Sequence, residues 1–114
     1  CPDQKVISLK GDGSSMYTVQ SLWIMARENL DIVVLVCANQ SYKSLQGELT
    51  NVGVDNTGKS ALEMLSLKDP SLDWVSVSKG MGVDAVRVDN IEDLVKNFKH
   101  GLKDNGPFLI EVMI

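Results

Sequence analysis

Two short groups of polar residues carry the atoms that a metal ion and a phosphate group need. The first is the string Gly11-Asp12-Gly13-Ser14, and the second begins at Asn39. Carboxylate and amide oxygens are ligands of the kind that Mg²⁺ prefers. A glycine beside the carboxylate lets a phosphate approach the backbone closely. Together the two groups predict an anchor for Mg²⁺ and a diphosphate, which is half of an active site.

Both groups follow apolar segments that are expected to be neighbouring strands. Residues 5–9 read as a short strand that ends in the glycine turn. Residues 32–38 are a continuous apolar run rich in β-branched residues, typical of a strand covered on both faces of a parallel sheet. Between them, apolar residues recur at three and four positions over 14–30, which predicts an amphipathic helix. In such a right-handed βαβ unit, Asp12 and Asn39 lie at equivalent strand ends.

The second half of the chain repeats this alternation of helices and strands. The predicted elements are a helix from near Ser41 to about 51, a loop over 51–60, a helix from Pro70 to about Lys79 capped by Asp69, a strand over 83–88, a helix capped by Asn90, and a strand over 108–114. This order predicts one domain over residues 1–114, folded as a three-layer α/β/α sandwich with a mainly parallel sheet.

The polar groups could hold the metal and the phosphate at the same time. Asp12 supplies a charged oxygen and Asn39 a neutral one, and a main-chain carbonyl just past Asn39 adds a third. Free N–H groups at the helix start, near Ser14 and Ser15, point toward an anion. The alternative for either group alone is an ordinary turn with a helix cap, because Asp, Gly, Ser and Asn are common turn residues. Their occurrence on one βαβ unit favours a site.

A dinucleotide-binding glycine motif is the first competing interpretation. It fails because its third glycine position holds Met16, whose side chain would obstruct close packing of helix and strand. The second strand also ends in Asn39, where such a motif expects a ribose-binding carboxylate.

A P-loop is the second competing interpretation. The spacing of glycine, four residues and Gly-Lys-Ser is matched by Gly53-Val54-Asp55-Asn56-Thr57-Gly58-Lys59-Ser60. A P-loop must follow a buried strand directly, and the polar residues 46–51 do not read as one. A P-loop nucleotide-binding protein and a non-catalytic α/β module therefore stay as alternative functions.

Composition bounds the class of partner and the compartment. The chain has 114 residues, 44% of them hydrophobic, and a net charge of -4, without the clustered basic face that nucleic acid requires. No apolar run approaches the ~18 residues of a membrane span. Cys37 lies in an apolar strand, and two cysteines fit a reduced, cytoplasmic protein better than a disulfide scaffold. The chain begins at Cys1-Pro2 and enters a strand almost at once, so we expect it to be cut from something longer.

Four more side chains have predicted environments. His100 comes late on an amphipathic helix, where a surface position is expected. Trp23 and Trp74 fall on helix faces and are predicted to be core residues. Tyr42 follows the proposed metal loop and either contacts the diphosphate or caps the core.

The sequence resembles the thiamine diphosphate enzymes, and in particular their acetolactate synthase-like and benzoylformate decarboxylase-like branch. The similarity extends along nearly the whole chain. It rests on Gly11-Asp12-Gly13-Ser14, residues 16–23, Ala26-Arg27-Glu28, Asn39-Gln40-Ser41-Tyr42, Leu72-Asp73-Trp74, Gly80-Met81-Gly82 and Leu109-Ile110-Glu111.

The resemblance implies a role for each matching residue. Asp12 and Asn39 would bind Mg²⁺, and Ser41 would add its main-chain carbonyl. Gly13 and Ser14 would hold the diphosphate of the cofactor, thiamine diphosphate. Gln40 stands where relatives often carry a basic residue. With the residues derived above, the predicted cofactor-binding set is Gly11, Asp12, Gly13, Ser14, Ser15, Asn39, Ser41 and Tyr42.

The resemblance also implies a reaction that this chain cannot complete alone. The family's lyases and transferases decarboxylate a 2-keto acid, then protonate the product or join it to another carbonyl. They require a glutamate from the pyrimidine-binding domain of a neighbouring subunit in a homo-oligomer. We expect the chain to be the carboxy-terminal part of the diphosphate-binding domain, with no catalytic residue of its own and inactive as an isolated piece. Unpaired sheet edges would then favour association of that piece.

Overall fold

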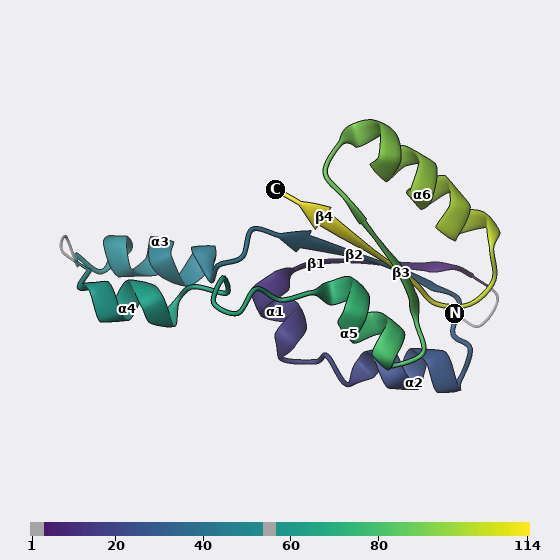
Figure 1. Cartoon of the computed structure of the whole chain (residues 1–114), viewed down its shortest axis with the longest axis horizontal. Helices are drawn as coiled ribbons and strands as arrows, with labels where there is room; N and C mark the ends of the chain where they lie inside the picture. Colours follow the sequence, from purple (N-terminus) through teal and green to yellow (C-terminus); the bar gives the residue numbers. More distant parts are fainter. Residues whose placement is uncertain (1–3, 54–56) are drawn as a thin grey trace.

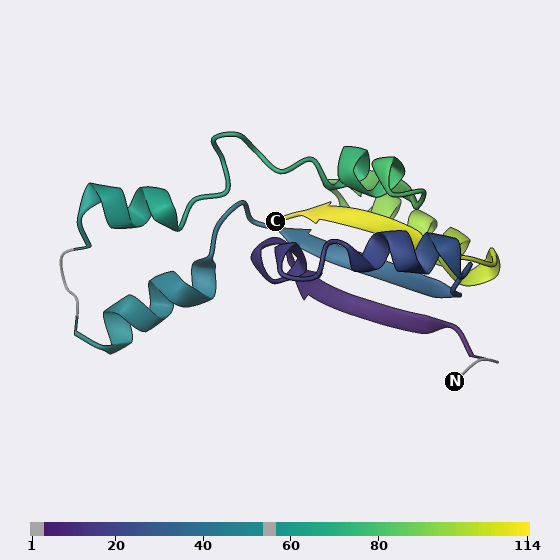
Figure 2. The same ribbon diagram turned by 90° about the horizontal axis from the view of Figure 1, so that it is seen from below.

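A fully parallel sheet forms the centre of the computed structural model, which describes residues 4–53 and 57–114. Over these residues the strand order is β1-β2-β4-β3. The strands are β1 (Val6–Gly11), β2 (Ile32–Ala38), β3 (Asp84–Val88) and β4 (Phe108–Met113). Helices cover both faces of this sheet (Figures 1 and 2), so the predicted α/β/α sandwich is confirmed.

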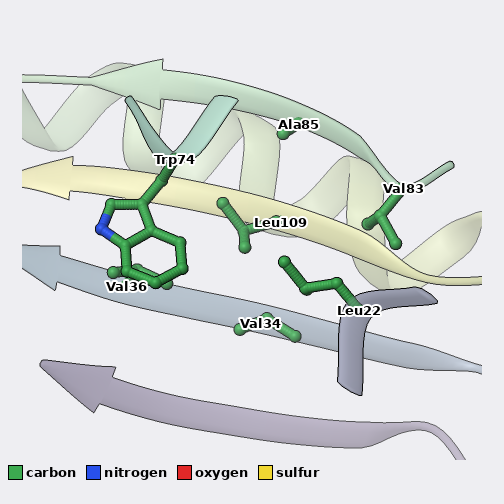
Figure 3. Close-up of a cluster of buried hydrophobic side chains, with 7 residues drawn as sticks. All are labelled: Leu22, Val34, Val36, Trp74, Val83, Ala85 and Leu109. Carbon is green, nitrogen blue, oxygen red and sulfur yellow. The ribbon is translucent and has the colours of Figure 1, made fainter. Parts of the chain in front are cut away.

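The apolar strands are central because helices bury both of their faces. On one face lie α2 (Ser21–Arg27) and α5 (Trp74–Gly80), and on the other lies α6 (Ile91–Lys103) (Figure 1). Figure 3 shows the larger core cluster, in which Trp74 and Leu22 pack over Leu109 and Val36. The second cluster, under α6, contains Val33, Val88 and Ile110. The prediction that Trp74 is a core residue is therefore confirmed, since it is only 2% exposed.

One edge of the sheet stays apolar and exposed. β1 pairs with β2, and β1 lies at the edge in Figure 2. Its side chains Ile7 and Leu9 are 52% and 70% exposed, although they lie in strand positions. An exposed edge strand of this kind can pair with another β-strand. None of the helices within the described ranges is long and apolar enough to cross a membrane.

Two helices project from the carboxyl end of the sheet. They are α3 (Lys43–Asn51) and α4 (Lys59–Met64), which extend away from the three layers in Figure 1. The predicted loop over 51–60 is therefore too long, because its last two residues begin α4. Residues 54–56 of the P-loop string lie outside the described residues. The element before the string is the helix α3 and not a buried strand, which removes the context that a P-loop requires.

The predicted helix over 14–30 is wrong in one respect, because the chain forms two helices there. α1 (Asp12–Met16) ends in a turn, and α2 starts at Ser21. The N–H groups of Tyr17 and Thr18 donate to carbonyls only three residues back, at 3.3 and 3.2 Å. Tyr17, Thr18 and Val19 lie at the break, and aromatic and β-branched residues have lowered helix propensity, so this segment does not favour one continuous helix.

The predicted burial of Trp23 is also wrong. Trp23 is 51% exposed on the outer side of α2, and the Arg27 guanidinium lies 4.8 Å from the centre of its ring. The preceding residue, Leu22, belongs to the core cluster and is 4% exposed. A half-exposed indole beside a guanidinium is a stable arrangement, because the cation is attracted to the face of the ring.

The N-terminal cap of α6 is the predicted residue, whereas the N-terminal cap of α5 is a different one. Asn90 caps α6 as predicted, since its Oδ1 accepts from the N–H of Asp93 at 2.8 Å. Helix α5 begins four residues later than predicted, because Asp73 and not Asp69 is its cap. The Asp73 carboxylate accepts from the backbone N–H of Ser76 at 3.2 Å and from its hydroxyl, and it pairs with Arg87 at 3.1 Å.

The charge on Asp73 gives the fold a predictable acid sensitivity. Hydrogen bonds from Ser76, with a smaller contribution from Arg87, hold the pKa of Asp73 below its ordinary value of 3.8. Its stabilising contribution is therefore complete above about pH 4 and is lost as the pH falls through the folded-state pKa. In Asp73→Asn, which keeps a capping oxygen without the charge, we expect the urea midpoint to fall less between neutral and acidic pH than in the wild type. Equal falls in the two proteins would contradict this role.

Candidate cofactor and metal site

The structure brings the two predicted polar groups together at the carboxyl ends of β1 and β2. The strands pair with Gly11 opposite Cys37, so Asp12 and Asn39 follow neighbouring strand ends. Asp12 Oδ2 accepts from the backbone N–H of Gln40, the residue after Asn39, at 2.6 Å. The carboxylate therefore ties the end of the first strand directly to the loop that carries the carboxamide.

Asp12 is a buried carboxylate held by backbone amides. It is 2% exposed, and its Oδ1 accepts from the N–H of Gly13 at 2.8 Å. Among the described residues no basic side chain forms a salt bridge with it. A buried anion is costly unless hydrogen bonds or a cation compensate it. Its two N–H donors position the carboxylate, and a bound metal ion would neutralise its charge.

The loop after β2 is held in a specific shape by Asn39. Its Oδ1 accepts from the N–H of Ser41 at 3.0 Å and from the hydroxyl of Ser41 at 3.3 Å. Gln40 has a φ of 55°, which is uncommon for a residue with a Cβ. Strained backbone of this kind persists only where surrounding bonds enforce it. Here the bond from Gln40 N–H to Asp12 is one such restraint.

A distant segment braces the same loop. Leu67 N–H donates to the carbonyl of Gln40, and Tyr42 N–H donates to the carbonyl of Leu65, both at 2.9 Å. These bonds form an isolated antiparallel bridge between Ser41 and Ser66. The sequence of residues 65–67 gives no sign that they brace the loop after β2, because the bridge is only one residue long. Only the fold shows this contact.

These residues surround a cleft of about 210 Å³. We call it the cofactor cleft. Seven of the eight predicted cofactor-binding residues line it, together with four residues that the sequence did not indicate. The predicted ones are Gly11, Asp12, Gly13, Ser14, Asn39, Ser41 and Tyr42, and the additional ones are Tyr17, Lys43, Ser44 and Leu45.

The eighth predicted residue lies beside the cleft. Ser15 is 6% exposed and its hydroxyl donates to the carbonyl of Gly11 at 2.9 Å. The ring of Tyr42 lies against Gly13, so closely that a Cβ added at Gly13 would be 2.7 Å from two ring carbons. Tyr42 therefore forms a wall of the cofactor cleft and does not cap the sheet core.

The cleft also faces the starts of two helices. α1 begins at Asp12, and α3 begins at Lys43 after Tyr42. Neither preceding residue, Gly11 or Tyr42, gives a side-chain capping bond. The first N–H groups of a helix have no partner within it and carry partial positive charge. The place of Lys43, Ser44 and Leu45 in the lining of the cleft could have been predicted from the sequence. They follow Tyr42 as the first turn of the expected helix, and a helix start is suited to binding an anion.

The donor set fits Mg²⁺ and a diphosphate. The described residues contain no group of three or more His, Cys, Asp or Glu side chains placed to hold a metal. Asp12 and Asn39 offer one charged and one neutral hard oxygen, which leaves ligand positions for a carbonyl, water and phosphate oxygens. The helix starts supply N–H groups for the remaining phosphate oxygens.

A protein-family model for the thiamine pyrophosphate enzymes, described as the C-terminal TPP binding domain, matches residues 1–112. The chain therefore belongs to this family and is a thiamine diphosphate-binding domain, as its resemblance had predicted.

Among curated relatives, it is 40% identical to a putative acetolactate synthase large subunit IlvX of Mycobacterium tuberculosis, over 99% of this chain and 22% of the relative. It is 31% identical to benzoylformate decarboxylase of Pseudomonas aeruginosa, over 97% of this chain and 20% of the relative. The chain thus spans about a fifth of the length of these relatives.

Solved structures show the same fold. A thiamine diphosphate-dependent 4-hydroxybenzoylformate decarboxylase of Rhodococcus jostii superposes with a TM-score of 0.86 at 33% identity, over 98% of this chain and 20% of the other. Benzoylformate decarboxylase of Polynucleobacter necessarius superposes with a TM-score of 0.87 at 26% identity and the same coverage. The βαβ unit that carries Asp12 and Asn39 lies within the shared fold.

Proposed function

We propose that this chain binds thiamine diphosphate through Mg²⁺ as part of a 2-keto acid decarboxylase or carboligase of the acetolactate synthase type. The observation that carries the proposal is the buried carboxylate of Asp12, which is hydrogen-bonded to the loop of Asn39. Asp12 is a buried charge with no basic partner in the part of the chain that the structure describes. Beside a neutral oxygen ligand and two helix starts without a side-chain cap, it fits a metal–diphosphate pair better than a structural turn.

Each wall of the cofactor cleft has a proposed role. Asp12, Asn39 and the main-chain carbonyl of Ser41 would hold Mg²⁺. The backbone at Gly13 and Ser14, and the first turn of α3, would bind the phosphate oxygens. Tyr42 would contact the diphosphate and exclude water from one side. When bound, thiamine diphosphate would supply a nucleophilic carbon for addition to the ketone and an electron sink for decarboxylation.

The rest of the catalytic apparatus would come from elsewhere in the enzyme. Among the residues that the structure describes, the ionisable side chains lining the cofactor cleft are those of Asp12, Tyr17, Tyr42 and Lys43, and Asp12 is the proposed metal ligand. From the resemblance to the family, we propose that the proton-transferring glutamate comes from the pyrimidine-binding domain of a neighbouring subunit in a cytoplasmic homo-oligomer. The isolated chain would be inactive, and the exposed edge at β1 would adjoin other parts of the enzyme.

Calorimetric titration tests the proposal. Thiamine diphosphate is added to the full-length protein that contains this chain, first with Mg²⁺ and then with a chelator. We expect saturable binding with Mg²⁺ and none with the chelator. ATP, titrated in the same way, tests the P-loop alternative, and binding of ATP that depends on Lys59 would replace the proposal.

A further inference from the structure

One buried hydrogen-bond donor in the core has no partner among the described residues. Trp74 is 2% exposed, and no group in the described part of the chain accepts from its Nε1–H. Buried N–H groups nearly always bond to another residue or to an ordered water, because an unpaired one is costly. Figure 3 shows this nitrogen on the side of the ring that faces the carboxyl ends of β2 and β4. That is the end of the sheet at which α1 begins, after Gly11.

The same tryptophan borders a small cavity between the sheet and the helices α1 and α2. The volume of this cavity is about 20 Å³. Roughly 10–15 Å³ is enough for one water molecule, provided that polar groups are present to bond it. Apart from the tryptophan, the cavity is lined by apolar side chains and by four polar ones. The polar ones are Lys10, Ser15, Thr18 and Ser21.

Ser15 has the hydrogen-bonding capacity that Trp74 lacks. It is 6% exposed, and its hydroxyl donates to the carbonyl of Gly11 at 2.9 Å. A hydroxyl oxygen has two acceptor positions, whereas an indole can only donate. A water between them would therefore accept from the indole and donate to Ser15. Thr18, whose Oγ1 accepts from Lys10 Nζ at 3.3 Å, carries a hydroxyl proton that can serve the same water.

We propose that this cavity binds one water molecule, which accepts a hydrogen bond from Trp74 Nε1 and donates one to Ser15 Oγ. The water joins the first residue of α5 to α1. Because α1 also carries Asp12 and Gly13, the water lies behind the wall of the cofactor cleft. The inference does not depend on which ligand that cleft binds. A cavity lined by apolar groups alone would stay dry, and the unpaired indole N–H is what favours water here.

A crystal structure of the full-length protein, at a resolution that shows ordered water, tests the site directly. We expect one water at about 2.7–3.2 Å from Trp74 Nε1 and about 2.5–3.0 Å from Ser15 Oγ. A dry cavity would overturn the inference. An acceptor for Trp74 Nε1 that comes from another part of the full-length protein would overturn it as well.

Hydrogen exchange followed by mass spectrometry tests the connection between α5 and α1 in solution. The backbone amides of residues 12–18 are followed in the full-length protein at constant pH and temperature. We expect Trp74→Phe to speed their exchange by roughly fivefold, because a hydrogen bond of ordinary strength no longer holds α1. In a Ser15→Ala background the same substitution should have little further effect, since the water has already lost a partner. Equal acceleration in both backgrounds would show that the ring acts by packing alone, and would overturn the inference.

Ser78→Ala is the matched control. The hydroxyl of Ser78 is buried on the same helix and has no partner among the described residues, but Ser78 does not line the cavity. Its removal should leave the exchange of residues 12–18 unchanged. An acceleration as large as that in Trp74→Phe would attribute the effect to α5 as a whole and contradict the water site.

Discussion

Replacing Asp12 by alanine is expected to abolish Mg²⁺-dependent binding of thiamine diphosphate, with a loss of affinity of at least about 100-fold. Loss of a residue that merely supports a metal ligand already costs roughly 10- to 100-fold in metal affinity. Of the residues that the structure describes, Asp12 is the only one whose carboxylate lines the cofactor cleft. Isothermal titration with Mg²⁺ present measures the effect. The variant also loses the bonds to Gly13 and Gln40, so its fold is checked by thermal unfolding.

A control variant at another carboxylate shows whether Asp12→Ala acts through the metal or only through the loss of a negative charge. Asp84 is exposed at the first residue of β3, at the opposite end of the sheet from the cleft. Asp84→Ala should bind the cofactor as the wild type does. Asp12→Asn should also fail, because its amide group can accept only one of the two backbone N–H bonds and carries no charge. Wild-type affinity in folded Asp12→Ala would contradict the assignment of the metal.

Adding one methyl group at Gly13 is expected to weaken cofactor binding by about tenfold or more. The Cβ of alanine would lie 2.7 Å from two carbons of the Tyr42 ring, so the ring must move. Overpacking of this kind costs roughly 1–3 kcal/mol, and each 1.4 kcal/mol is about a factor of ten in affinity. The backbone of Tyr42 is held by Leu65, so the displacement falls on its side chain, at the wall of the cleft.

Two further variants test whether Gly13→Ala weakens cofactor binding by displacing the ring of Tyr42. Gly47→Ala adds the same methyl group in α3, where a Cβ would meet nothing within 4 Å, so cofactor affinity should not change. In the double variant Gly13→Ala with Tyr42→Ala, the contact no longer exists. Its loss of affinity should be smaller than the sum of the two single losses. Additive losses would show that the ring of Tyr42 does not mediate the effect of Gly13.

The sequence predicted correctly those features that depend on a short, local pattern of residues. The β-branched run at 32–38 predicted a central strand, and the polar groups at Asp12 and Asn39 predicted where neighbouring strands meet. Asn90 was recognised as a cap because its signal lies within four residues of the helix it starts. Each of these signals is contained in a short stretch of chain, so no distant contact was needed to interpret it.

The features that were missed depend on distant contacts. Trp23 and Leu22 are adjacent apolar residues of one helical pattern, and the contacts of the fold bury Leu22 in the core cluster while Trp23 stays 51% exposed. Asp69 and Asp73 are both plausible caps by type, and the ion pair of Asp73 with Arg87 on β3 accompanies the cap that the fold uses. The bridge between Ser41 and Ser66 joins segments on either side of the helices α3 and α4, so no motif could indicate it.

The position of the metal is the most direct test of the account. A crystal of the full-length protein grown with thiamine diphosphate and Mn²⁺ in place of Mg²⁺ gives an anomalous signal at the metal. We predict one peak in the cofactor cleft, coordinated by the Asp12 carboxylate, the Asn39 amide oxygen and the Ser41 carbonyl. A peak whose ligands exclude Asp12 and Asn39, with the diphosphate bound elsewhere, would contradict it.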